Sequence, residues 1–337
     1  MHYFITGHTG FKGSWLIHVL RSQGHTVSGY SNQALPDSLF VKTASKNFLE
    51  WDFQGDIRNL KNLTSSLRKS KPDILIHLAA QSLVTKSYLD PLETFSTNVD
   101  GTRNVLLAAR ETKSLSATLI VTSDKVYRNF ERSGSYVESD PLGGHDPYSS
   151  SKAMADLMTQ SFIHLEPQSP IGIARAGNVI GGGDICEQRL IPDIIRAIEE
   201  KSTLRLRYPK AVRPWQHVLD CLSGYLEILK VLLATGKSNV WNVGPDSKDF
   251  NNVETVVKLF LEKVNESIDV RSVRAKFVEA NELKLNSDKL RTESNWKNKL
   301  SFEDSVEWTA QWYSHVKHQR LSPINAVTKQ VDNFIGF

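Results

Sequence analysis

The segment His2–Gly13 reads HYFITGHTGFKG and places a short apolar run directly before three glycines in the spacing GxxGxxG. Apolar residues then recur at helical spacing from Trp15 to Leu20. Such glycines allow a tight turn, close approach of the backbone to a pyrophosphate and close packing of helix on sheet. Ordinary strand-to-helix turns can show the same spacing. Because this loop lies at the first strand-to-helix junction of the chain, however, a dinucleotide-binding site is favoured. The candidate cofactor-binding residues in this loop are Gly7, Thr9, Gly10, Phe11, Lys12 and Gly13.

Beyond this loop, strand-like runs alternate with stretches of helical period. The apolar runs include Thr26–Tyr30, Asp73–Leu78, Ala117–Thr122 and Ile171–Ala174, and one long helix is expected near Glu93–Lys113. This alternation with near-continuous apolar strands predicts an α/β fold, a doubly wound parallel Rossmann-type sheet covered by helices on both faces.

The composition changes after residue 176, where the chain becomes glycine-rich and the expected elements become shorter. We expect a dinucleotide-binding domain at residues 1–176, with residues 215–240 returning to it. A smaller, partly interleaved substrate-binding domain is expected at residues 177–214 and 241–337.

The composition itself is ordinary, since 40% of the 337 residues are apolar and 23% are charged. The formal charge of +4 comes from scattered basic residues, which argues weakly for an anionic small molecule and gives no support for nucleic acid. Only Cys186 and Cys221 are present, so neither a disulfide framework nor a cysteine-based metal site is expected. Without a signal-peptide pattern or an apolar run of ~18 residues, we expect a cytoplasmic protein with no membrane partner.

The stretch Thr118–Asn129 reads TLIVTSDKVYRN, in which a buried strand runs into Ser123, Asp124 and Lys125. Ligands of doubly wound sheets bind at the carboxyl ends of the strands. A hydroxyl, a carboxyl and an amine are therefore expected at the active edge, and a surface ion pair is the less favoured alternative.

Tyr148 and Lys152 lie four residues apart on an expected helix and so share one face. A phenol with a pKa of ~10 acts as a base at neutral pH only if that pKa is lowered, which a neighbouring ammonium favours. Together with Ser123, this YxxxK pair suits transfer of a hydride and a proton between an alcohol and a nicotinamide. The pair alone also occurs by chance on surface helices.

Two features bear on the choice of dinucleotide. The acid expected ~20 residues after the glycines, which would bond a ribose hydroxyl, is missing from the sequence GYSNQ at residues 29–33, so NAD and NADP are not distinguished there. Further on, Asp56 and Ile57 follow a predicted third strand. Asp56 either contacts the adenine or caps the helix at Asn59–Lys69, with equal support for each.

Several motifs together resemble one family. GHTGFKGSWL, HLAAQSLV, TNVDGT, TSDKVY, DPLGGHDPYSSSK, RAGNVIGGGD, RLIPD and RPWQHVL are similar to the extended short-chain dehydrogenase/reductases, and within them to the CDP-glucose 4,6-dehydratase branch of the NAD-dependent epimerase/dehydratase family. The resemblance covers roughly residues 3–315. It implies a tightly held NAD that is reduced and reoxidised in one turnover, and a nucleoside-diphosphate sugar as substrate.

The resemblance also implies roles for the residues at the strand end. Tyr148 would take the proton from the sugar O4 as hydride leaves C4, Lys125 would take the C5 proton, and Asp124 would protonate the departing C6 hydroxyl. Hydride would then return to C6. Because Lys125 must be neutral and Asp124 protonated, and direct pairing would oppose both, we expect the two side chains to point apart. Lys152 and the nicotinium charge would make Lys125 less basic.

Further site residues are implied by matches to the family motifs. Asn98 is expected to support the active-site hydrogen bonds, or else to pack inside a helix. Arg189 and Arg213 are expected to bind the diphosphate, with structural ion pairing as their alternative. The remaining matches are the cofactor-side residues Ala79, Ala80 and Gln81 and the substrate-side residues Asn178, Leu190 and His217. Trp215 and His217 are expected to pack and orient neighbouring groups and not to catalyse.

Departures from the family pattern occur at Leu283–Trp296 and Ser31–Asp37, so the nucleotide and the hexose stay open. A C4-epimerase or 4-reductase is the rival enzyme, since it needs Tyr148 and Lys152 but not the neighbouring acid and amine. A non-catalytic NAD-binding sensor is the other rival. By analogy, a homodimer is expected to form through helices at residues 91–113 and 149–165.

Overall fold

The computed structural model describes residues 1–131, 134–274 and 280–336. Its centre is a seven-stranded sheet in the order β11-β6-β5-β4-β1-β2-β3, in which all paired strands are parallel. The strands are β1 His2–Thr6, β2 Thr26–Ser31, β3 Trp51–Gln54, β4 Ile74–His77, β5 Ala117–Val121, β6 Ile171–Ala176 and β11 Asn239–Val243.

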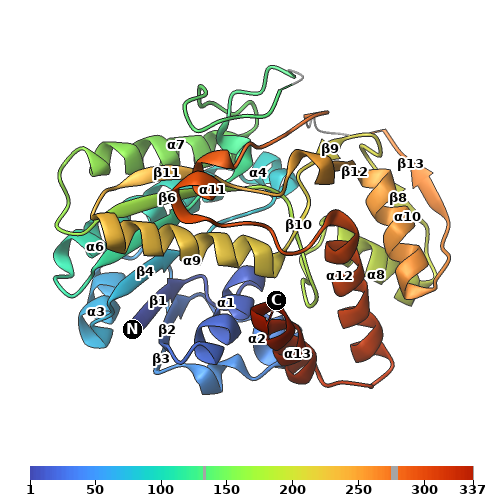
Figure 1. The fold of residues 1–337 in the computed structure, drawn as a ribbon, viewed down its shortest axis with the longest axis horizontal. Coiled ribbons are helices and arrows are strands. Elements are labelled where there is room, and N and C mark those ends of the chain that lie inside the picture. Colours follow the sequence, from blue (N-terminus) through green and yellow to red (C-terminus); the bar gives the residue numbers. More distant parts are fainter. Residues whose placement is uncertain (132–133, 275–279, 337) are drawn as a thin grey trace.

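Helices cover both faces of this sheet (Figure 1). Alternate residues of β1 face opposite ways, so that Tyr3 and Ile5 pack in one apolar cluster while Phe4 packs in the other. The first cluster contains α1 Phe11–Ser22 and α9 Val218–Thr235, and the second contains α3 Leu60–Ser70, α6 Gly101–Glu111 and part of α7 Pro147–Ile163. The predicted doubly wound α/β fold is confirmed.

The order of the strands reverses beside β1. The chain runs from β1 outwards to β2 and β3, and then returns to place β4 on the other side of β1. Such a switch point leaves a crevice at the carboxyl ends of the strands. The glycine loop after β1 and the polar triplet after β5 both open on this edge.

A second group of elements packs around its own apolar core on one side of the sheet, at the right of Figure 1. Its helices are α8 Leu190–Glu200, α10 Val253–Val264 and α12 Phe302–Lys317. Its short strand pairs are β7 Val179–Ile180 with β10 Gln216–His217, β8 Leu204–Leu206 with β13 Val270–Ser272, and β9 Val212–Arg213 with β12 Asn251–Asn252.

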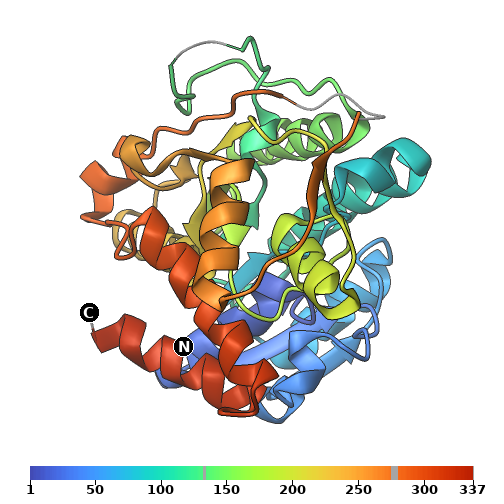
Figure 2. The ribbon, with the colours of Figure 1, turned by 90° about the vertical axis from the view of Figure 1, so that its right-hand side faces the viewer.

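The C-terminal part of the chain does not pack wholly with this second group. β11 adds the seventh strand to the main sheet, α11 Asp288–Ser294 packs on α9, and α13 Pro323–Gly336 packs on α1. Figure 2 shows α13, in red, beside the blue N-terminal elements. These segments were expected in the smaller domain, so the contacts depart from the expected boundary, and the division into two domains stays a prediction.

The expected long helix near residues 93–113 is interrupted. It divides into α5 Pro91–Phe95, one π-helical turn at Ser96–Asp100 and α6. Short helices elsewhere are α2 Leu39–Lys42 and α4 Val84–Leu89, with 3-10 turns at Ser45–Phe48, Asp124–Val126 and Ser247–Asp249. Within the described ranges, no helix is both long and apolar enough to cross a membrane.

A buried ion pair joins α7 to β6. Arg175 donates from Nε and Nη2 to both carboxylate oxygens of Asp156, each at 2.8 Å, and both side chains are almost fully buried. Thr122 also donates to Asp156, at 3.0 Å, and Arg175 donates to the Tyr127 hydroxyl at 3.0 Å. The pair therefore ties the helix that carries Tyr148 to the segment on either side of the polar triplet.

Asp156→Asn is expected to lower the free energy of unfolding by about 3–5 kcal/mol, because it leaves the Arg175 charge buried without a counter-ion. Urea unfolding followed by circular dichroism measures the change. The matched control is Glu111→Gln, which removes the partner of Arg68 in an exposed ion pair and should cost less than about 1 kcal/mol. A similar small cost for Asp156→Asn would show that the buried pair does not hold the two elements together.

Candidate active site

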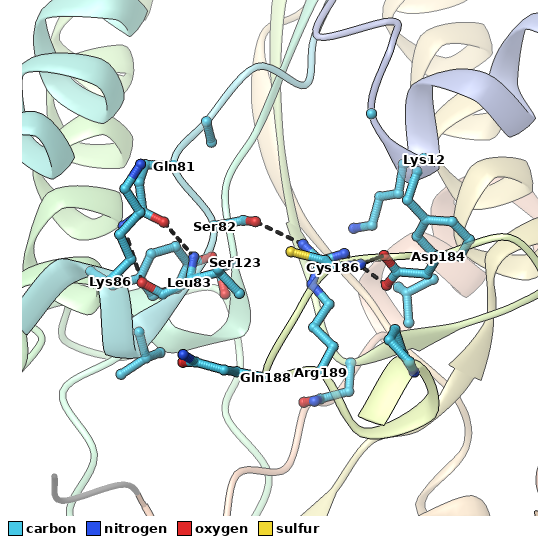
Figure 3. Close-up of a pocket in the computed structure, with 18 of the residues that line it drawn as sticks. Lys12, Gln81, Ser82, Leu83, Lys86, Ser123, Asp184, Cys186, Gln188 and Arg189 are labelled. Atoms are coloured by element: carbon cyan, nitrogen blue, oxygen red, sulfur yellow. Dashed lines mark hydrogen bonds and ion pairs between the residues drawn. The ribbon is translucent and has the colours of Figure 1, made fainter. Parts of the chain in front are cut away.

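A cavity of about 790 Å³ opens at the carboxyl edge of the main sheet and extends to β8 of the second group. All of the expected site residues except Asn98 and His217 are among its described lining. The lining includes Gly7, Thr9, Gly10, Phe11, Lys12, Gly13, Asp56, Ile57, Ala79, Ala80, Gln81, Ser123, Asp124, Lys125, Tyr148, Lys152, Asn178, Arg189, Leu190 and Arg213. Segments from both parts of the chain thus meet around one cavity (Figure 3).

The glycine loop has the geometry that a dinucleotide cradle requires. Gly7 has a φ of 76°, which favours glycine, and a Cβ atom at Gly13 would lie 2.4 Å from the Gly7 carbonyl oxygen. Gly10 is the N-cap of α1 and provides no side-chain cap, so the first N–H groups of this helix are not capped by that residue. A helix N-terminus in this arrangement suits a pyrophosphate.

The segments after β2 and β3 form one end of the cavity. Asp56 lines it and is paired with Arg58, which lowers the pKa of the Asp56 carboxyl. The N-cap of α3 is Asn59, whose side chain accepts from the Asn62 N–H, so the alternative in which Asp56 caps this helix is wrong. An adenine contact for Asp56 stays a proposal. Arg58 also lines the cavity and was not predicted.

Tyr148 lies near the start of α7 and is hydrogen-bonded to the Ser123 side chain. Burial raises the pKa of Tyr148 to about 12, and the nearby Arg189 charge opposes that rise. The expected lowering of this pKa by Lys152 is therefore wrong for this structure, because desolvation of the phenolate outweighs nearby charges. Lys152 instead donates to the Val121 carbonyl at 3.0 Å, and burial lowers its pKa to about 8.

Asp124 has the environment of a carboxylic acid that holds its proton. Its Oδ1 accepts from Ser123 at 2.9 Å, and its buried Oδ2 has no hydrogen-bond partner among the residues that the structure describes. Burial raises the pKa of Asp124 even though the Lys125 charge lowers it. This direction is the one required of a general acid, whereas the relative orientation of Asp124 and Lys125 stays a prediction.

Arg189 crosses the cavity between its two walls. It donates to Asp184 at 2.9 Å and to Ser82 at 2.7 Å, as the dashed lines in Figure 3 show. Asp184 follows three glycines, whose absent side chains let the chain pass close to its neighbours: a Cβ at Gly182 would lie 2.0 Å from the Trp312 ring. The role of Asp184 in holding Arg189 was missed, although RAGNVIGGGD contains it.

Arg213 also lines the cavity and is almost fully buried. Its guanidinium donates to the backbone carbonyls of Val212 at 2.9 Å and Ala280 at 2.6 Å. Its charge lowers the pKa of Asp124, which places it close to the strand-end triplet. An anion bound between Arg189 and Arg213 would therefore lie next to the proposed reacting groups.

His217 is not among the described lining of the cavity, so it does not contact a substrate there and has the packing and orienting role that was expected as its alternative. Its ring is fully buried between Trp15 and Trp308, and its Nδ1 accepts from the Leu219 N–H at the start of α9. Burial lowers its pKa to about 3, so the imidazole is neutral. It caps and positions α9.

Asn98 also lies behind the cavity wall, in the π-helical turn. Its side chain accepts from the Gln81 N–H at 2.8 Å and donates to the Gln81 carbonyl and to the Ser151 hydroxyl, both at 2.9 Å. It therefore joins the segment after β4 to α7, and a π-helical turn that presents such a side chain is often found at a functional site.

Fold and site define a class of protein. A glycine loop after β1, with a serine after β5 and a tyrosine–lysine pair on the following helix, is the arrangement of an extended short-chain dehydrogenase/reductase. The model of the family described as GDP-mannose 4,6 dehydratase matches residues 4–309, and the chain belongs to this family.

Particular relatives narrow the comparison. CDP-glucose 4,6-dehydratase of Salmonella typhimurium is 44% identical over 264 residues, which cover 75% of this chain and 74% of that protein. CDP-paratose 2-epimerase of Salmonella typhi is 27% identical over 94% of this chain and 100% of its own length. The resemblance to the dehydratase branch is confirmed.

Solved structures share the fold. dTDP-glucose 4,6-dehydratase from Bacillus anthracis, in complex with NAD, has a TM-score of 0.81 at 24% identity and covers 94% of this chain and 98% of its own. UDP-glucose-4-epimerase from Stenotrophomonas maltophila has a TM-score of 0.84 at 19% identity and covers 95% and 100%. A dehydratase and an epimerase therefore share this architecture, so the fold alone does not separate the two activities.

Proposed function

We propose that the protein is an NAD-dependent 4,6-dehydratase of nucleoside-diphosphate hexoses, with CDP-glucose as its substrate. The observation that carries this proposal is Asp124, a buried carboxyl with a raised pKa beside the Ser123–Tyr148 hydrogen bond. A dehydration needs an acid at this position, whereas a simple exchange of hydride does not. The 44% identity to a CDP-glucose enzyme supports the choice of nucleotide.

The first step would be oxidation at C4. Tyr148, hydrogen-bonded to Ser123, would take the O4 proton, and the nearby Arg189 charge would favour the phenolate. The residues of the glycine loop would hold NAD, whose nicotinamide would supply a hydride acceptor for C4 and afterwards the hydride for C6. Because burial raises the pKa of Tyr148 to about 12 here, the phenolate needs added positive charge, and an oxidised nicotinamide would provide it.

The second step would be loss of water. The 4-ketone makes the C5 hydrogen acidic, and Lys125 would remove it in its neutral form. Asp124 would donate its proton to the departing C6 hydroxyl, which its raised pKa favours. Arg189 and Arg213 would bind the diphosphate, and Asn178 and Leu190 line the same cavity.

The rival enzyme on this scaffold is a C4-epimerase or 4-reductase. It would use Ser123, Tyr148 and Lys152 in the same way but has no use for a protonated acid after β5. The raised pKa of Asp124 therefore favours dehydration. A non-catalytic NAD sensor is disfavoured because the whole set of reacting groups lines one cavity.

The product would be a 4-keto-6-deoxy sugar nucleotide, and we therefore propose a role in deoxysugar biosynthesis. A cytoplasmic location stays a prediction.

We also propose a homodimer through the helices at residues 91–113 and 149–165, which include α5 and α7. These helices pack together and leave Leu92, Met154 and Leu157 exposed, which supports an apolar interface. Sedimentation that shows only monomer at micromolar concentration would contradict the dimer.

The test is incubation with CDP-, dTDP-, UDP- and GDP-hexoses in deuterated water, followed by mass spectrometry and NMR. We expect loss of one water from CDP-glucose with solvent deuterium at C5. Turnover without loss of water would support the epimerase or reductase. No change in any sugar would contradict an enzymatic function on these substrates and favour the sensor.

A further inference from the structure

Lys12 occupies an unfavourable place for a cation. It is the second residue of α1, and the positive end of a helix dipole opposes a positive side chain in the first turn. The first turn of α1 contains no acidic residue that would compensate. Helix stability therefore does not account for this lysine, whose side chain projects into the cavity in Figure 3.

The Lys12 ammonium is held by a residue from another element. Its Nζ donates at 3.0 Å to the hydroxyl of Tyr225, a fully buried residue of α9. The same hydroxyl is hydrogen-bonded to Cys221, one turn earlier on α9. A buried phenol thus directs the ammonium to one place, although neither Tyr225 nor Cys221 has a role in the proposed reaction.

Lys12 lines the same cavity as the proposed reacting groups Asp124, Tyr148 and Lys152. The Lys12 charge lowers the pKa of Lys152 and opposes the rise in the pKa of Asp124. Tyr225, its partner, also interacts electrostatically with Tyr148. Because Tyr148 is proposed to take the O4 proton, the sugar C4 and the nicotinamide that accepts its hydride must meet close to these same groups.

We propose that Lys12 tunes the redox balance of the bound nicotinamide, favouring its reduced form and so the oxidation of the sugar at C4. The inference rests on the proposed function. In that step the C4–H bond breaks, the hydride and its electron pair pass to the nicotinamide, and the O4 proton passes to Tyr148. The ring loses its positive charge, so a fixed cation nearby disfavours the oxidised form relative to the reduced form.

An alternative role makes a different prediction. If Lys12 only anchored the pyrophosphate, it would strengthen the binding of NAD⁺ and NADH equally, because both carry the same pyrophosphate. The ratio of the two dissociation constants therefore separates redox tuning from simple anchoring, and it does not depend on turnover.

The experiment measures the dissociation constants of NADH, by its fluorescence, and of NAD⁺, by competition, for the full chain and its variants. Lys12→Met is expected to lower the ratio Kd(NAD⁺)/Kd(NADH) about tenfold, the order of effect of a unit charge roughly 10 Å away at an effective dielectric constant of about 20. For a two-electron couple, tenfold is about 30 mV. Lys12→Arg should restore the ratio, and Tyr225→Phe should shift it part of the way.

The control is Lys61→Met, which removes the same charge from the exposed surface of α3 and should leave the ratio unchanged. Equal weakening of both forms by Lys12→Met, or no change in the ratio, would overturn the redox role while leaving the dehydratase proposal intact. Failure of the wild-type chain to bind either form would overturn the redox role together with the cofactor assignment.

Discussion

Tyr148→Phe is expected to lower kcat for dehydration of CDP-glucose by about 10²–10⁴-fold, the range associated with loss of a general acid–base group. The variant keeps the ring, which is buried at the cavity wall, and removes only the hydroxyl that is bonded to Ser123. Steady-state assays with the preferred nucleotide sugar would measure the loss.

The control for this variant is Tyr3→Phe, which removes a hydroxyl from a mostly buried tyrosine of β1 outside the described cavity lining. It should keep kcat close to that of the wild type, and thermal unfolding should show that both variants are folded. A Tyr148→Phe enzyme that retained more than about a tenth of the wild-type kcat would mean that another group takes the O4 proton.

Lys125→Met is expected to block the reaction after oxidation. Because Tyr148, Ser123 and Lys152 are unchanged, C4 oxidation should proceed. The reduced cofactor should then accumulate once substrate is added, and its near-ultraviolet absorbance would measure this. Solvent deuterium should not enter C5, and kcat should fall by about 10²–10⁴-fold. Lys61→Met is again the matched control, with normal turnover and normal deuterium incorporation.

Full turnover by Lys125→Met would show that the assigned C5 base is wrong.

Asp124→Asn tests the loss of water, since an amide cannot donate the proton that the C6 hydroxyl needs. It should allow C4 oxidation and C5 exchange but slow the loss of water. In the wild type, protonated Asp124 disappears as the pH rises through its raised pKa, so the elimination rate should fall in that direction.

The sheet and the glycine loop could be predicted because their signals are local. The alternation of apolar runs indicates strands and helices from neighbouring residues alone. The glycines at 7, 10 and 13 lie close together because only two residues separate each from the next. The place of the polar triplet at the carboxyl edge could be predicted as well, since parallel strands end at one edge, whereas the substrate-side residues came from the resemblance to the family. Those predictions needed no knowledge of which distant segments pack together.

The parts that could not be predicted depend on how deeply a side chain is buried and on contacts between residues far apart in the sequence. His217 belongs to the motif RPWQHVL, but the motif does not reveal that two tryptophans enclose its ring. Arg213 is held by the carbonyl of Ala280, 67 residues further along the chain. The pKa of Tyr148 rises because burial outweighs nearby charge, and a sequence does not give the degree of burial.

The Arg175–Asp156 pair also limits how the enzyme can move. Since Asp156 holds Thr122, and Arg175 holds Tyr127, residues on both sides of the polar triplet are fastened to α7. We therefore expect the polar triplet and the residues of α7 to move together. Separating them would cost about as much free energy as breaking a buried ion pair. We therefore expect the cavity to open between these groups and the β8 side, which would leave the alignment of the groups undisturbed.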